Sequence, residues 1–179
     1  MHEPLFDLID LARPDGRRIA KAIYGARGFV LHHNTDIWGD AVPIDGVGSG
    51  IWAMGGAWLS LHLWDHYDFT RDRAFLAKRA YPVMKEAAEF FLDYLVDDGK
   101  GHLITGPSIS PENTYKMANG VTARLCMGPT MDTEITRQLF SRVMAAGEIL
   151  GIDREFRAKV KSASDRLEPF QIGKYGQLQ

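Results

Sequence analysis

The chain has a single cysteine, Cys126, among its 179 residues. One thiol excludes an internal disulfide and any metal site built from several cysteines. No apolar run is long enough to span a bilayer, and the first residues lack the basic start and apolar stretch of a signal peptide. These features predict a soluble chain with no membrane partner, and they leave the compartment of the full-length protein open.

A strong charge of one sign is also missing. The chain has 21 basic and 23 acidic residues, dispersed rather than in runs, for a formal net charge of -2. This distribution gives no footprint for nucleic acid. No glycine-rich phosphate loop follows a strand pattern and no Gly-x-Ser-x-Gly is present, so nucleotide and acyl-transfer chemistry lack a signal. We expect no cofactor.

What the chain does have is helical periodicity. An apolar stripe predicts a short helix that stops before Pro14 and a second helix that starts there. Residues 51–67 are apolar on nearly all sides and predict a buried helix, in which Gly55-Gly56 permits close approach of another backbone. Asp72 and its neighbours then start a long amphipathic helix, which Pro82 should kink or split.

A buried helix followed by an amphipathic helix is predicted again nearer the C-terminus. Thr130 is expected to cap an inner-type helix whose first turn carries Asp132, and Asp153 to cap an outer-type helix that ends before Pro169. On the preceding outer helix, Glu86 is expected to face water. Residues 102–105 could form one arm of a small β-hairpin.

Alternating inner and outer helices predict an all-α fold of helical hairpins, a layered ring or solenoid with at most a small β-hairpin. We treat residues 1–179 as a single segment without an internal domain boundary. In such a fold, the long loops at residues 29–50 and 106–128 both precede inner helices. They should therefore emerge at the same end and converge on one cleft.

The second of these loops carries the candidate catalytic residue, Glu112. Pro107 and Pro111 exclude a helix between them and make a stiff turn. Apolar neighbours at Ile109, Tyr115 and Met117 would raise the carboxyl pKa, as a general acid requires. The alternative is that Glu112 only caps the next segment or pairs with Lys116.

The first loop has the mixture that binds a sugar ring. Residues 32–38 combine imidazole, amide, carboxylate and indole groups, among them His33, Asn34, Asp36 and Trp38. Polar groups suit sugar hydroxyls, and an indole suits the apolar face of a pyranose. The alternative is an Asx-turn, in which a side chain of this loop bonds to the nearby backbone, beside a buried tryptophan.

Other carboxylates and histidines are also candidates for a chemical role. Asp36, Asp40 and Asp45 are each candidates for a second carboxylate that works with the acid. His62 and His66 stand one helical turn apart, as two metal ligands would, but no third ligand accompanies them. We therefore expect no metal site.

Several long motifs occur in order over nearly the whole chain. They are His32-His-Asn-Thr-Asp-Ile-Trp-Gly-Asp40, Trp52-Ala-Met-Gly-Gly-Ala-Trp58, Leu61-His-Leu-Trp-Asp-His-Tyr67, Ser108-Ile-Ser-Pro-Glu-Asn-Thr-Tyr115, Gly128-Pro-Thr-Met-Asp132 and Gln171-Ile-Gly-Lys-Tyr-Gly-Gln-Leu-Gln179. Together they resemble glycoside hydrolase family 95, the α-L-fucosidases. The resemblance implies a segment of an (α/α)6 toroid, incomplete at both ends, and inverting hydrolysis of terminal α-L-fucosyl or α-galactosyl linkages.

By this resemblance Glu112 matches the general acid, and the substrate is a fucosylated oligosaccharide or glycan. The asparagine and aspartate that activate water in the family would lie outside this chain. The residues expected to line the sugar subsite are His33, Asn34, Asp36, Trp38, Trp52 and Asn113. The competing hypothesis is a non-catalytic helical module that binds sugar or acts as a scaffold. A partial ring would also expose apolar inner-helix surface, so we expect self-association.

Overall fold

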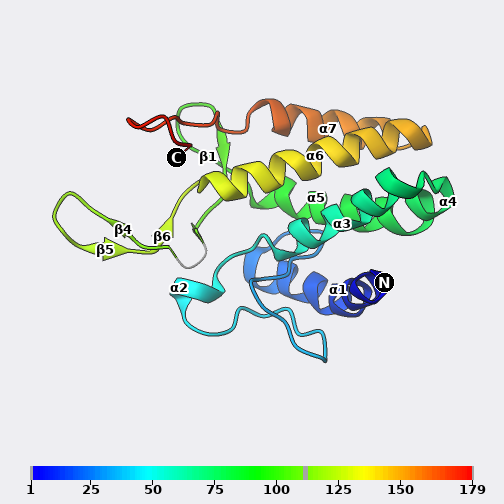
Figure 1. Ribbon diagram of the computed structural model, residues 1–179, viewed down its shortest axis with the longest axis horizontal. Helices are drawn as coiled ribbons and strands as arrows, with labels where there is room; N and C mark the ends of the chain where they lie inside the picture. Colours follow the sequence, from blue (N-terminus) through cyan, green and yellow to red (C-terminus); the bar gives the residue numbers. More distant parts are fainter. Residues whose placement is uncertain (1, 111–112, 179) are drawn as a thin grey trace.

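The computed structural model describes residues 2–110 and 113–178. Five long helices lie roughly side by side in layers, while loops and short strands gather at one end (Figure 1). In the described residues no helix is long and apolar enough to cross a membrane. The long helices are α1 (Glu3–Tyr24), α3 (Gly55–Thr70), α5 (Tyr81–Tyr94), α6 (Thr130–Leu150) and α7 (Arg154–Asp165).

Helix α1 is continuous, so the predicted break at Pro14 is wrong. Proline removes one backbone donor from a helix but does not stop it where packing holds both halves. Buried residues run along the whole length of α1, from Phe6 before the proline to Ala20 after it. Their burial against the core carries the helix through Pro14.

Helix α3 is the central element of the fold. It packs against α1, α5 and α6, which confirms that it is an inner helix. It begins at Gly55 rather than at residue 51. A Cβ on Gly55 would lie 2.3 Å from the His32 carbonyl oxygen, so only glycine permits this approach of the loop. One side of α3 remains open, where the Phe69 side chain is 92% exposed.

The outer helix after α3 is split before Pro82, as predicted. The Asp72 carboxylate accepts hydrogen bonds from two backbone N–H groups and starts α4 (Arg73–Phe75). A π-helical turn, η1 (Leu76–Ala80), then leads into α5. Because proline cannot donate a helical hydrogen bond, an irregular turn next to Pro82 is expected.

The chain between α5 and α6 forms three small antiparallel ladders. The predicted hairpin after α5 is present, and two further ladders hold the long loop that follows. The pairs are β1 (Val96–Asp97) with β2 (Leu103–Ile104), β3 (Ser108–Ile109) with β6 (Leu125–Cys126), and β4 (Tyr115–Lys116) with β5 (Thr122–Ala123).

Two details of the C-terminal helices differ from expectation. The cap position of α6 is Pro129, and Thr130 is its first helical residue. Asp153 does precede α7, but its side chain makes no capping hydrogen bond. Its carboxylate accepts instead from Tyr81 and from Lys85, 3.0 and 2.7 Å away, and so joins the start of α7 to α5.

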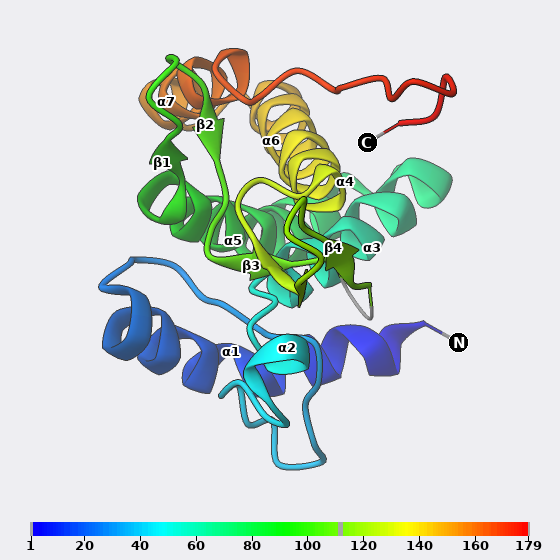
Figure 2. The same ribbon diagram turned by 90° about the vertical axis from the view of Figure 1, so that its left-hand side faces the viewer.

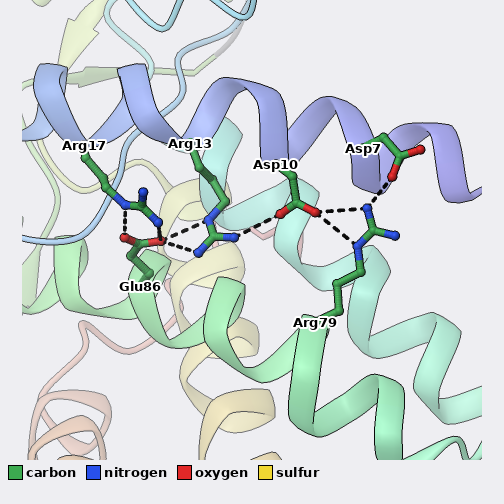
Figure 3. A network of polar contacts seen from close by, with 6 residues as sticks. All are labelled: Asp7, Asp10, Arg13, Arg17, Arg79 and Glu86. Carbon is green, nitrogen blue, oxygen red and sulfur yellow. Dashed lines mark hydrogen bonds and ion pairs between the residues drawn. The ribbon is translucent and has the colours of Figure 1, made fainter.

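A chain of alternating charges joins α1 to the outer helix (Figure 3). Glu86, which was expected to face water, turns toward α1 and pairs with both Arg13 and Arg17. Sequence periodicity placed Glu86 outside the core but could not show that α1 covers that surface. We call this network the α1–α5 seam; its members are Asp7, Asp10, Arg13, Arg17, Arg79 and Glu86.

Candidate functional site

A cleft of about 440 Å³ opens at the loop end of the molecule. Seen from that end, α2 (Val47–Gly50) and strands β3 and β4 lie in front of the helices (Figure 2). The cleft draws on both long loops, as the sequence predicted, and on the starts of α3 and α6. Its lining residues are His33, Asp45, Ser49, Trp52, Trp58, Ile109 and Met131.

Two tryptophans form the aromatic wall of the cleft. The Trp52 and Trp58 rings meet edge to face, with centroids 5.7 Å apart. Trp52 is buried and Trp58 is 45% exposed, so the first is fixed and the second is open to a ligand. A rigid aromatic surface of this kind suits the apolar face of a sugar ring.

A buried carboxylate lies directly behind Trp52. Asp132, in the first turn of α6, accepts a hydrogen bond from the Trp52 indole N–H at 3.2 Å and another from the Thr105 hydroxyl at 2.8 Å. Burial raises the pKa of Asp132 to about 6, and the hydrogen bonds from Thr105 and Trp52 oppose the rise. Every one of these donors is neutral.

His33 and Asp45 form a polar pair on another wall. Nε2 of His33 lies 3.0 Å from a carboxylate oxygen of Asp45, whose side chain is 62% exposed. The Asp45 backbone has a positive φ of 62°, which is uncommon outside glycine. This pair adds hydrogen-bonding groups to the cleft that the tryptophans also line.

The loop that carries these residues is anchored by His32. Nδ1 of His32 lies 2.7 Å from the Ala41 carbonyl oxygen, which can only accept, so Nδ1 donates. Nε2 therefore accepts from the Tyr24 hydroxyl at 2.6 Å. Burial lowers the pKa of His32 and keeps the ring neutral. The backbone N–H of Ala41 donates in turn to Asp15 on α1.

Comparison with known proteins identifies the family of this chain. The model of the glycosyl hydrolase family 95 catalytic domain matches residues 1–179. The chain belongs to glycoside hydrolase family 95. Within it, the chain is 39% identical over 178 residues to "Alpha-L-fucosidase 2" of Arabidopsis thaliana, covering 98% of this chain and 21% of that protein.

A second family 95 relative is "Probable alpha-fucosidase A" of Aspergillus niger, 30% identical over 184 residues that cover 99% of this chain and 23% of that protein. The chain thus spans about a fifth of the length of these relatives. A solved structure, "Putative kojibiose phosphorylase from human microbiome", matches with a TM-score of 0.71 at 14% identity, over 97% of this chain and 26% of that one. This likeness confirms the predicted fold class, part of an (α/α)6 toroid.

The structure brings some of the expected family 95 subsite residues together and sets others apart. Trp52 and His33 line the cleft. The Asp36 carboxylate accepts from the backbone N–H groups of Trp38 and Asp40, so it holds its own turn, and the Asx-turn of the alternative is present here. The Trp38 side chain is 76% exposed rather than buried, and Asn34 accepts from the next backbone N–H.

Glu112 lies outside the described residues. Its neighbour Asn113 is exposed and donates to the Ser110 hydroxyl at 2.9 Å. Of the three apolar neighbours expected for the acid, Ile109 is buried in the cleft wall, whereas Tyr115 and Met117 are 45% and 43% exposed on the β4–β5 hairpin. The strand β3, which leads into the Glu112 loop, therefore forms part of the cleft.

The helical histidines make other contacts. His66 Nδ1 lies 2.6 Å from Nε2 of His2, and His62 faces Asp65 at 3.7 Å. Among residues 2–110 and 113–178, no cluster of three or more His, Cys, Asp or Glu side chains is placed to hold a metal ion.

Sequence reasoning missed two features of the site. It treated Ser49 as part of a loop and Asp132 as an acid that favours a helix start. For Trp58, the close spacing of the tryptophans left a sugar-binding cleft and core packing equally open, and the structure places this side chain in the cleft. For Asp132, the sequence offers no signal, because its partners lie 80 and 27 positions earlier in the chain.

Proposed function

We propose that this chain is part of the catalytic domain of an inverting glycosidase that hydrolyses terminal α-L-fucosyl linkages, with Glu112 as the general acid. The observation that carries the proposal is the cleft itself, in which a two-tryptophan wall meets the strand that leads into the Glu112 loop. The two relatives, which are both named as fucosidases, support fucose as the sugar.

The cleft offers the two kinds of contact that a terminal deoxysugar needs. Trp52 and Trp58 present apolar surface to the C–H face and methyl group of fucose, and the His33–Asp45 pair presents polar groups to its hydroxyls. Glu112 follows the cleft-wall residue Ile109 by three positions in the sequence. In the proposed step, the protonated Glu112 carboxyl donates its proton to the glycosidic oxygen as the bond to the anomeric carbon breaks.

The group that activates water is proposed to lie outside this chain. Three carboxylates near the loop end are already engaged: Asp36 holds its own turn, Asp45 bonds to His33, and Asp132 is fully buried. An inverting reaction needs a base on the face of the sugar opposite the acid. We therefore expect residues 1–179 alone to hydrolyse fucosides weakly or not at all.

The test is release of fucose from 2'-fucosyllactose by the protein at its natural length, followed by proton NMR. Inversion predicts that β-L-fucose is the first product, before mutarotation. Glu112→Gln should lower kcat by about 10²- to 10⁴-fold, the usual range for a lost acid catalyst. Wild-type turnover that survives Glu112→Gln, or an initial α product, would overturn the proposal.

A non-catalytic sugar-binding module is the second candidate, favoured by the exposed face of Trp58 in the cleft. It is distinguished by titration with L-fucose, followed by tryptophan fluorescence. Saturable quenching by a natural-length protein that releases no fucose would favour binding alone.

A further inference from the structure

We infer that Asp132 is a positioning residue, which fixes the Trp52 wall of the cleft relative to the segment that leads into the Glu112 loop. The inference rests on the proposed function, because it assigns Asp132 a role in the cleft where fucose would bind. Asp132 is 0% exposed, so it acts through its neighbours and does not touch the sugar.

The carboxylate joins three segments that are distant in the sequence. Oδ1 accepts from the Trp52 indole just before α3, and Oδ2 accepts from the Thr105 hydroxyl just after β2. Asp132 itself sits in the first turn of α6. Because one rigid carboxylate binds both donors, Trp52 and Thr105 cannot shift independently of each other.

Thr105 transmits this restraint to both ends of the long loop. Its carbonyl oxygen accepts from the backbone N–H of Gly128 at 2.8 Å, so the point where the loop leaves and the point where it returns are tied together. Strand β3 starts three positions after Thr105 and contributes Ile109 to the cleft. Asp132 therefore sets both the aromatic wall and the base of the Glu112 loop.

The chemistry of the contact argues against simple filling of the core. A buried carboxylate is costly, and its partners Thr105 and Trp52 are neutral donors that supply no compensating positive charge. The N-terminal end of α6 favours a negative charge but does not require one at this position. A carboxylate can accept two hydrogen bonds in a fixed geometry, which an apolar side chain at this position could not do.

The test compares Asp132→Asn with Asp153→Asn in the protein at its natural length. Asparagine keeps the shape of Asp132 but has one acceptor oxygen, so one of the two donors loses its partner. Asp153 offers a matched control, because it also accepts two side-chain hydrogen bonds and lies beyond the other end of α6. A helix of this length separates the two positions by roughly 30 Å.

We expect Asp132→Asn to lower kcat/KM for 2'-fucosyllactose by roughly tenfold or more, with a raised KM, because a hydrogen bond to a carboxylate is lost. Asp153→Asn should leave kcat/KM within about twofold while lowering the melting temperature. In a Trp52→Phe background, which already lacks the indole N–H, Asp132→Asn should have a smaller effect on KM.

A second readout does not depend on activity. In protein labelled with ¹⁵N-tryptophan, the Trp52 indole resonance, assigned with Trp52→Phe, should shift and exchange faster in Asp132→Asn than in wild type or Asp153→Asn. An unchanged Trp52 resonance would overturn the inference, and so would a shifted resonance with unchanged kcat/KM. If wild-type protein releases no fucose, the proposed function fails, and the indole spectrum alone decides whether Asp132 holds Trp52.

Discussion

The α1–α5 seam and the cleft end of α6 each hold a carboxylate, partly buried at Glu86 and fully buried at Asp132, and the pKa shifts in opposite directions at the two places. At the seam, burial alone would raise the pKa of Glu86, yet hydrogen bonds from Arg17 and Arg13 outweigh it and lower the pKa. At the cleft, burial raises the pKa of Asp132 to about 6, against hydrogen bonds from neutral groups alone.

The difference shows two roles for a carboxylate: one stabilises the fold, and the other positions neighbouring side chains. Glu86 is ionised and paired, so it ties two helices together at neutral pH. The burial of ionised Asp132 lowers the stability of the fold, whereas its hydrogen bond to Trp52 fixes the position of the aromatic wall. Groups with unfavourable burial of this kind cluster at functional sites. Changes at the seam should therefore affect stability, and changes at the cleft end should affect binding.

Between the seam and the cleft wall, the larger effect on substrate binding should come from the aromatic wall. Trp52→Ala should raise KM for 2'-fucosyllactose by roughly 30-fold or more, as expected for truncation of a buried aromatic anchor. Trp38→Ala is the matched control: because the Trp38 side chain is 76% exposed outside the cleft, KM should stay within about twofold. Equal effects of the two substitutions would place the sugar elsewhere.

The pH dependence of stability should distinguish the two carboxylates next. Asp132 has a raised folded-state pKa, so its contribution is fully present below about pH 4 and is lost as the pH rises through about 6. Relative to wild type, Asp132→Asn should gain on the order of 3 kcal/mol of stability between pH 4 and pH 7.5. Tyr94 and Cys126, whose pKa values the Asp132 charge helps to raise, titrate above this window.

The measurement is urea unfolding of both proteins across that range. Glu86→Gln should behave in the opposite sense, because the lowered pKa of Glu86 gives stability that is present above the usual carboxyl pKa and lost as the pH falls. A constant difference between wild type and Asp132→Asn at all pH values would show that Asp132 does not titrate in this way.

At the seam, Glu86→Gln should cost about 2 kcal/mol of unfolding free energy at pH 7, because Arg13 and Arg17 lose a shared partner. The fucosidase kcat/KM of the folded protein should stay within about twofold. Thermal or urea unfolding together with initial rates checks both expectations. A loss of activity without a loss of stability would contradict the assignment of the seam to stability and of the cleft to binding.

The smallest effect should come from the loop anchor. His32→Phe leaves the Tyr24 hydroxyl and the Ala41 carbonyl oxygen without their partner, at a cost of about 1–2 kcal/mol. The folded-state pKa of His32 is lowered, so its contribution is present above about pH 6.5 and is lost as the pH falls. The cost should therefore shrink in acid, which unfolding at pH 7.5 and pH 5 would show.

Much of the fold could be predicted because its signals are local. The split before Pro82, the Asp72 cap and the close approach at Gly55 each depend on a few adjacent residues. The errors arose where distant packing decides. Pro14 stays inside α1 because buried residues on both sides hold the helix. Asp153 leaves its own helix uncapped because it reaches α5.

The candidate site was predictable to the same extent. The order of inner and outer helices implied that the two loops converge, and Trp52, His33 and Ile109 do meet in one cleft. The sequence could not show which residues of the first loop point away from the cleft. Asp36 is one of them in function, because its carboxylate bonds to the backbone of its own turn.

The proposed function depends on proton donation from Glu112 to the leaving group. The most direct measurement compares kcat/KM of Glu112→Gln on 2'-fucosyllactose and on p-nitrophenyl α-L-fucoside, using protein of natural length. A sugar leaving group needs protonation and p-nitrophenolate does not, so the loss should be about 10²-fold or more on the first substrate and much smaller on the second. Equal losses on both substrates, or no loss on 2'-fucosyllactose, would contradict the account.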